Sequence, residues 1–273
     1  LWQAGHVQAG HVAYINGAVH QHGVWYYFPE ALALKASLPL ACLGLAGAAA
    51  ALLARRREVA QWVLLPAALL VVLAGASGIE IGVRYVLPVF PLLAVAGAFC
   101  LLPWTGPAPF RRGPGPDRRW RAVARAALVA ALLAAPVTAL ASAGGHIGYF
   151  QLVDRPERYL SDSNLDWGQD AWRLRDWWVA AGRPPLTNTY FSQLPLSAYG
   201  IDSTLVSPTS EPAGPGLYAI SLTHATAFGR GADCPYVHAL LAPITARVGT
   251  SIVVTHIPGL LPRQRPGPDA DCL

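Results

Sequence analysis

The stretch "YLSDSNLDWGQD" (Tyr159–Asp170) separates two parts of the chain that differ in composition. Long apolar runs with short arginine-rich loops precede it, and a tryptophan-rich and then mixed polar sequence follows it. Of the 273 residues, 53% are hydrophobic and only 13% are charged, whereas an average soluble domain has about 25% charged residues. The composition therefore favours a membrane protein.

Four apolar runs precede this boundary, and each is close to the about 20 residues that cross a bilayer as a helix. Buried helices of a soluble all-α protein are the alternative, but the runs have almost no polar face. The predicted fold class is an α-helical membrane domain with four transmembrane helices plus a small extracytoplasmic α/β domain. The expected spans are residues 31–54, 59–79, 85–103 and 122–141.

Arginines gather in two of the loops, at Arg55–Arg57 and at Arg111–Arg121. The positive-inside rule places both loops in the cytoplasm. We therefore expect a multi-pass protein of the inner (plasma) membrane whose C-terminal domain is extracytoplasmic. The expected parts are an outer loop (1–30), a transmembrane domain (31–144), an outer α/β domain (145–260) and a disordered tail (261–273).

The predicted outer domain contains a helix and several strands. In "AWRLRDWWVAAG" the apolar positions recur at helical spacing, and Gly182 is a plausible stop. Strand-like sequence occurs at 186–192, 216–224 and 250–257, with a short helix expected at 235–244. Cys234 and Cys272 both fall after the spans, and whether they pair stays open.

The acidic boundary stretch can be compared with a calcium-binding EF-hand loop. Asp162, Asn164 and Asp166 match the first three ligand positions. However, Trp167 stands where the loop needs glycine and Arg173 where it needs glutamate, so this interpretation is disfavoured.

The same stretch also resembles the start of a helix. Asp166 is expected to accept a hydrogen bond from the backbone N–H of Gln169, and Asp170 to favour the helix dipole. Capping leaves Asp162, Asn164 and Trp167 unexplained. A contact with the membrane domain or with a substrate is a third interpretation.

Two basic residues are candidates for binding a phosphate near the outer leaflet. Lys35 lies inside the first apolar run, where its alternative is to extend its ammonium group to the interface. Arg84 precedes the third run, and a guanidinium group suits bidentate contact with phosphate. Its alternative is a plain interfacial anchor.

Metal and nucleic-acid sites have little support in the sequence. His20 and His22 form an H-x-H pair without further ligands at defined spacing. No cofactor is assigned, although a divalent cation stays open. The net charge of +5 is spread over loops and not over one basic face, so no nucleic-acid partner is expected.

Three stretches, "GVWYYFPEALALKASLPL", "IGVRYVLPVFPLL" and "YLSDSNLDWGQDAWRLRDW", occur in this order. Together they resemble bacterial membrane glycosyltransferases of the C-type fold, in the protein O-mannosyltransferase and aminoarabinose transferase group. The resemblance implies transfer of a sugar from a polyprenyl-phosphate donor to a protein or lipid acceptor at the outer membrane face. The chain would be the C-terminal part of such an enzyme and would lack the N-terminal acidic catalytic loop.

The resemblance implies that Lys35 and Arg84 bind the donor phosphate, while the catalytic residue stays unknown. A transporter or flippase for a lipid-linked solute is an alternative function, as is a non-catalytic membrane scaffold with a partner-binding outer domain. Further candidates for contact with substrate or between domains are Tyr27, Glu30, Tyr85, Asp162, Asn164, Asp166 and Trp167.

Overall fold

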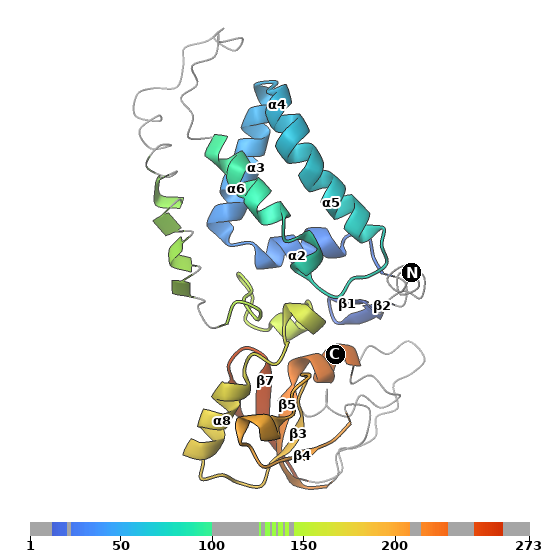
Figure 1. The fold of residues 1–273 in the computed structure, drawn as a ribbon, viewed down its shortest axis with the longest axis vertical. Helices are drawn as coiled ribbons and strands as arrows, with labels where there is room; N and C mark the ends of the chain where they lie inside the picture. Colours follow the sequence, from blue (N-terminus) through green and yellow to red (C-terminus); the bar gives the residue numbers. More distant parts are fainter. Residues whose placement is uncertain are drawn as a thin grey trace.

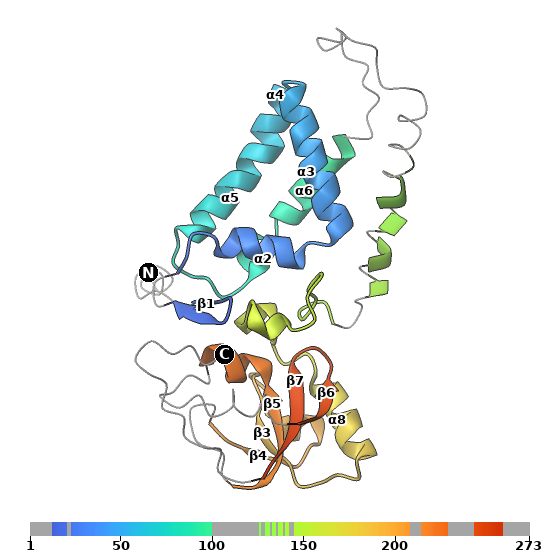
Figure 2. The same cartoon turned by 180° about the vertical axis from the view of Figure 1, so that it is seen from behind.

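The computed structural model describes residues 13–20, 23–99, 126, 129–131, 133–134, 136–138, 140–141, 145–207, 214–228 and 243–258. A layer of helices lies at one end of the molecule, and a five-stranded sheet with a helix beside it lies at the other (Figures 1 and 2). The segment that follows residue 145 runs between the two parts.

The first described elements form a small hairpin. Strands β1 (Ala13–Ile15) and β2 (Ala18–His20) are antiparallel and join through Asn16 and Gly17. Both turn residues have positive φ, at 51° and 82°, which is the requirement of the two-residue turn that matches strand twist. A bridge from Ile15 to Leu160 connects this hairpin to the boundary stretch.

The first apolar run forms two helices instead of one. Helix α2 covers Tyr27–Lys35 and helix α3 covers Leu38–Leu53, with extended backbone at Ala36 and Ser37 between them. Pro39 explains the break. Its ring has no N–H to donate to the carbonyl of Lys35 and would clash with it in a continuous helix, but it is tolerated in a first helical turn.

The second apolar run forms one continuous helical rod. It comprises α4 (Arg57–Val59), a π-helical turn η1 (Ala60–Leu64) and α5 (Leu65–Gly75). The wide turn ends two residues before Pro66, which lacks an N–H for the usual helical hydrogen bond, so the turn accommodates the proline within the rod.

The third apolar run starts with a short 3₁₀ turn, η2 (Val83–Val86), before helix α6 (Val89–Ala98) begins. Pro88 separates the two elements. Helix α6 packs closely along α3, where the two backbones touch at Gly47: a Cβ placed on Gly47 would lie 1.8 Å from the carbonyl oxygen of Ala96. Small residues allow this close approach of two helices.

This arrangement shows that the predicted fold class is wrong. Among the described residues, one helical segment, Arg57–Ala76, is long and apolar enough to cross a membrane, instead of the predicted four. Pro39 and Pro88 set the starts of α3 and α6, which have 16 and 10 residues, or about 24 and 15 Å at about 1.5 Å per residue. The fourth predicted span lies partly outside the described residues and contains the shorter apolar helix Val129–Thr138.

Short 3₁₀ turns lead from the helices into the sheet region. They are η4 (Pro156–Arg158) and η5 (Asp162–Asn164), followed by helix α8 (Ala171–Ala180). The sheet has the strand order β4-β3-β5-β7-β6, in which β3 pairs in parallel with β4 and β5, and β7 pairs antiparallel with β5 and β6. The strands are β3 (Thr187–Thr189), β4 (Thr204–Leu205), β5 (Gly216–Ser221), β6 (Ile244–Val248) and β7 (Ile252–Ile257); η6 (Leu196–Tyr199) and η7 (His224–Phe228) connect them.

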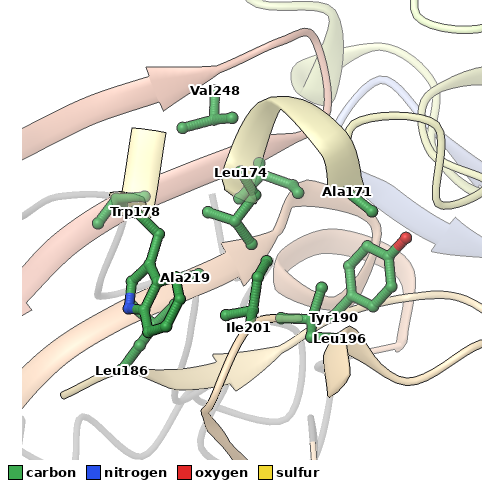
Figure 3. Close-up of a cluster of buried hydrophobic side chains, with 11 residues drawn as sticks. Ala171, Leu174, Trp178, Leu186, Tyr190, Leu196, Ile201, Ala219 and Val248 are labelled. Atoms are coloured by element: carbon green, nitrogen blue, oxygen red, sulfur yellow. The ribbon is translucent and has the colours of Figure 1, made fainter. Parts of the chain in front are cut away.

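Helix α8 covers one face of this sheet. Its buried side chains Leu174 and Trp178 meet Ala219 of β5 and Val248 of β6 (Figure 3). The opposite face carries Tyr218 and its neighbours Ile220, Ala225 and Ile257. The alternation along β5 follows from the two-residue period of a strand.

The predicted helix and three predicted strands of this part are confirmed. Helix α8 ends before Gly182, which adopts a positive φ of 84°, as expected of a glycine beyond a helix C-terminus. The helix predicted at 235–244, the partners Cys234 and Cys272, His22 and the tail fall largely or wholly outside the described residues.

Candidate functional site at the junction

Asn164 is the centre of a buried hydrogen-bond network that joins the boundary stretch to the helices. Its Oδ1 accepts a hydrogen bond from the backbone N–H of Val83 (2.9 Å), and its Nδ2 donates to the phenol oxygen of Tyr27 (2.8 Å). The neighbouring Ser163 hydroxyl donates to the carbonyl of Ile81 (2.6 Å). These contacts fix the backbone just before Arg84 against the start of α2.

Lys35, one of the two predicted phosphate ligands, is buried in the same network. Its Nζ donates to the carbonyl oxygens of Ile147 (2.5 Å), Tyr149 (3.0 Å) and Asn164. The ring of Phe150 lies 4.0 Å from Nζ. Because an ammonium group has three N–H donors, these carbonyl oxygens occupy all of them.

The environment of Lys35 therefore suits a structural role. Burial lowers the pKa of Lys35 to about 7, while three carbonyl acceptors favour the charged form. In this conformation, no N–H remains to hold a phosphate. The predicted donor-binding role of Lys35 does not fit this geometry. The carbonyl oxygens of Ile147, Tyr149 and Asn164 occupy the positions that phosphate oxygens would need.

Glu80 is a buried carboxyl group beside this network. It is only 1% exposed, and its Oε2 accepts a hydrogen bond from the backbone N–H of Val24 (2.7 Å). Within the described part of the chain, no donor reaches its Oε1. Burial raises the pKa of Glu80 and also that of Tyr27. A carboxyl group this enclosed cannot contact a substrate.

Arg84, the second predicted ligand, has the opposite environment. It is exposed, and its guanidinium carbon lies 5.3 Å from the ring of Tyr85 and 5.2 Å from the ring of Trp167. Trp167 in turn contacts Phe191 edge to face, with 5.6 Å between ring centroids. No carboxylate of the described residues pairs with Arg84. We call these four residues, Arg84, Tyr85, Trp167 and Phe191, the Arg84–Trp167 surface.

The two aspartates of the predicted helix cap have other partners. Asp166 Oδ1 accepts from the N–H of Gly168 (2.9 Å) and Oδ2 from the hydroxyl of Ser221 (2.5 Å). The predicted bond from the N–H of Gln169 to Asp166 is therefore wrong. Gly168, at a positive φ of 81°, turns the chain so that helix α8 begins only at Ala171.

Asp170 directly precedes α8 but directs its carboxylate to the β6–β7 turn. Its Oδ2 accepts from the backbone N–H groups of Thr250 (2.7 Å) and Ser251 (3.0 Å) and from the Ser251 hydroxyl (2.9 Å). Its Oδ1 accepts from Arg173 (2.7 Å). The aspartate thus joins the boundary stretch to the far edge of the sheet.

Burial also affects the protonation of Asp166. It raises the pKa of Asp166 to about 6, against the lowering effect of its hydrogen bonds.

The remaining predicted residues make local hydrogen bonds. Asp162 is buried with φ at 57° and accepts from the N–H of Ser163 (2.5 Å), and Glu30 accepts from Asn16 (3.0 Å).

Sequence reasoning missed two features of the junction. Phe150 and the carbonyls of residues 147 and 149 belong to the Lys35 site, and Phe191 belongs to the Arg84–Trp167 surface. Backbone acceptors carry no sequence signal. The position of Phe191, shortly after the end of a parallel strand, is the one available signal, because ligand sites gather at such ends.

Metal coordination finds no site in the described part of the chain. No group of three or more His, Cys, Asp or Glu side chains suited to a metal ion occurs there. The acidic residues of the boundary stretch are engaged with backbone N–H groups, hydroxyls and an arginine. His20 lies in β2.

Comparison with known proteins found no protein-family model, curated protein or solved structure that matches this chain. The resemblance to membrane glycosyltransferases therefore stays a prediction based on the three quoted stretches.

Proposed function

We propose that this protein binds the phosphate of a polyprenyl-phosphate-linked sugar at Arg84 and takes part in transferring that sugar to a protein or lipid acceptor. One observation carries the proposal: Arg84 is an exposed guanidinium group, without a carboxylate partner among the described residues, at the edge of an apolar helical layer. A guanidinium group binds phosphate oxygens in bidentate fashion.

The apolar helical layer supports contact with lipid. Along the rod formed by α4, η1 and α5, the side chains of Trp62, Leu65, Val72 and Leu73 are between 52% and 76% exposed. Several large apolar side chains exposed along one helix mark an interaction surface. The segment Arg57–Ala76 has 20 residues, which is enough to cross the hydrocarbon core of a bilayer as a helix. A membrane explains this surface without another protein partner.

The orientation of the rod supports an extracytoplasmic site. Arg55–Arg57 lie at the end of the helical layer that is far from the sheet (Figure 1). The positive-inside rule assigns that end to the cytoplasm, so the junction and the sheet are proposed to lie on the outer face of the plasma membrane. Arg84 is on the junction side, where a lipid headgroup would be.

Arg84 would act by electrostatics in this reaction. Transfer breaks the bond between the sugar C1 and a phosphate oxygen and forms a bond from C1 to the acceptor oxygen. The negative charge on the departing polyprenyl phosphate grows as the bond breaks, and a fixed guanidinium group stabilises it. The acceptor proton must pass to a base, and Glu80 is too buried to take it.

Binding of radiolabelled polyprenyl phosphate to the protein in phosphatidylcholine nanodiscs tests the proposal. Because a hydrogen bond to a charged group is worth about 1.5–3 kcal/mol, we expect Arg84→Ala to weaken binding by about tenfold or more. Arg84→Lys should retain part of the affinity, since it keeps the charge and loses the planar fork.

Arg175 provides a matched control. It is an exposed arginine whose guanidinium carbon lies 5.6 Å from the ring of Trp172 on α8. Arg175→Ala should leave binding unchanged, and uncharged polyprenol should not compete. Equal affinity of the Arg84→Ala variant and the unsubstituted protein would contradict the proposal. Transfer of labelled sugar, measured in membranes from cells that express each variant, should be lowest for Arg84→Ala, intermediate for Arg84→Lys and unchanged for Arg175→Ala.

A further inference from the structure

Trp167 is an exposed indole in a loop that the surrounding residues hold in place. The side chain is 48% exposed, although the guanidinium group of Arg84 and the ring of Phe191 both lie against it. An indole that stays half open beside two partners presents apolar surface to solvent without burying it in a core. The exposed part of this ring is therefore accessible to a ligand.

The loop around Trp167 is fixed by hydrogen bonds on both sides. The backbone N–H of Trp167 donates to Oε1 of Gln169 (2.7 Å), and the N–H of Gly168 donates to Asp166. The hydroxyl of Tyr190 donates to the carbonyl of Gly168 (2.7 Å). A Cβ on Gly168 would lie 2.7 Å from that hydroxyl oxygen, so a larger residue cannot replace it without displacing the loop.

The closeness of Trp167 and Arg84 matches the chemistry of a glycosyl phosphate. In such a group the sugar ring is bonded directly to a phosphate oxygen, so a phosphate on Arg84 places the sugar within reach of the adjacent indole. One face of a pyranose is lined with C–H groups, which pack on the electron-rich face of an aromatic ring. An arginine and an indole in contact therefore complement both halves of the group.

From this geometry we propose that Trp167 is the platform on which the sugar of the donor lipid packs while Arg84 holds its phosphate. This inference rests on the proposed function and adds the sugar subsite to it. Phe191 supports the ring from the edge, and the Asp166–Gly168 turn sets its position. Trp167 is then a specificity-determining residue for glycosylated over bare polyprenyl phosphate.

Two lipids that differ only in the sugar test this inference. Binding of mannosyl phosphoryl polyprenol and of bare polyprenyl phosphate is measured in the same nanodiscs, with the protein and its Trp167→Ala and Trp167→Phe variants. We expect Trp167→Ala to lower affinity for the glycosylated lipid by about tenfold and to leave binding of the bare lipid unchanged. Trp167→Phe should recover part of the loss.

Trp172 is the matched control for Trp167. It is 58% exposed on α8 and also lies beside an arginine, Arg175, and an aromatic ring, Tyr199. Trp172→Ala should change neither affinity. An equal loss for both lipids in Trp167→Ala would show that the indole only positions Arg84, which would overturn the sugar subsite.

The two proposals fail in different ways. If the unsubstituted protein binds neither lipid, the proposed function is wrong and the sugar subsite with it. If Arg84→Ala weakens binding of both lipids but Trp167→Ala leaves both unchanged, the phosphate site stands and the sugar subsite is wrong. Circular dichroism of each variant checks that the fold is retained, since Trp167 is exposed and its loss should not unfold the chain.

Discussion

The helical layer and the sheet domain differ in how they place their apolar side chains. The sheet domain buries its apolar side chains between α8 and the strands and holds its loops with aspartates such as Asp166 and Asp170. The helical layer leaves large apolar side chains exposed and brings backbones together at Gly47. A core that excludes water needs polar hydrogen bonds at its edges, whereas the helical layer relies on a close backbone contact between α3 and α6.

The junction contains one buried and one exposed basic residue. Lys35 is a buried cation that belongs to a helix but binds carbonyls of the segment leading to the sheet. Arg84 is an exposed cation that starts the third apolar run and rests on an indole of that same segment. One cation holds the two parts together and the other stays available, which is why they should respond differently to substitution.

The largest expected effect is on the sheet domain alone. Asp170→Ala removes the acceptor of two backbone N–H groups, that of the half-buried Thr250 and that of the buried Ser251. At about 1–3 kcal/mol for a group left without its hydrogen bond, we expect a loss of about 4 kcal/mol in the free energy of unfolding. Hydrogen exchange should accelerate at β6 and β7 and stay unchanged in α3. Faster exchange in α3 as well would show that the two parts unfold as one unit.

The next effect should reach both parts. Lys35→Met keeps the length of the side chain and leaves the carbonyls of Ile147, Tyr149 and Asn164 without their donor. We expect destabilisation by about 3 kcal/mol, measured by thermal unfolding in detergent micelles. Arg175→Met, at an exposed position, is the control and should change stability by less than about 0.5 kcal/mol.

The Lys35→Met variant also tests whether Lys35 stabilises the junction or binds phosphate. Exchange should increase in residues 147–151 and at the end of α2, because both lose the same anchor. Stability equal to that of the unsubstituted protein, together with weaker binding of polyprenyl phosphate, would return Lys35 to the role of a phosphate ligand.

Sequence reasoning succeeded where local pattern determines structure. Helix α8 follows from its apolar spacing, and β3, β5 and β7 follow from short apolar stretches between turn residues. It failed for the number of spans, because run length was counted without the prolines within it. Pro39 and Pro88 each remove an N–H and block a carbonyl, so two of the runs divide or shorten.

The candidate site was predictable only in part. The sequence indicates Arg84 and Trp167 as unusual residues, but their contact joins positions that are far apart in the chain. The role of Lys35 depends on backbone carbonyls, which every residue has and which no motif displays. The cap predicted for Asp166 failed because a left-handed Gly168 moved the start of the helix.

The stability of the sheet domain should depend on pH through the buried carboxyl group of Asp166. Burial raises the pKa of Asp166 to about 6 in the folded protein, above the ordinary value of an aspartate, about 3.9. The folded state therefore binds the proton more tightly than the unfolded state, so stability falls as pH rises from about 4 to about 6. At about 1.36 kcal/mol per pKa unit, the loss is on the order of 2 kcal/mol.

Asp166→Asn is the matched variant for this titration. The amide keeps an oxygen for the N–H of Gly168 and presents an N–H group to the hydroxyl of Ser221, while it cannot ionise. Its stability relative to the unsubstituted protein should rise between pH 4 and pH 6 by about the same 2 kcal/mol. Parallel pH profiles of the two proteins would show that Asp166 ionises normally.

The smallest effect tests the helical layer. Gly47→Ala places a methyl group where the carbonyl of Ala96 lies 1.8 Å away, so α3 and α6 must separate. Overpacking of this kind costs about 1–3 kcal/mol, and we expect about 1–2 kcal/mol because two short helices can shift. Gly75→Ala is the control, since its Cβ would be 3.6 Å from the nearest atom. Exchange should increase in α3 and α6 but not in β5 or β7, because no polar hydrogen bond at the edges of the sheet domain depends on that contact. An equal increase in the sheet strands would mean that the close helix contact also stabilises the sheet, and the contrast between the two parts would then be one of composition only.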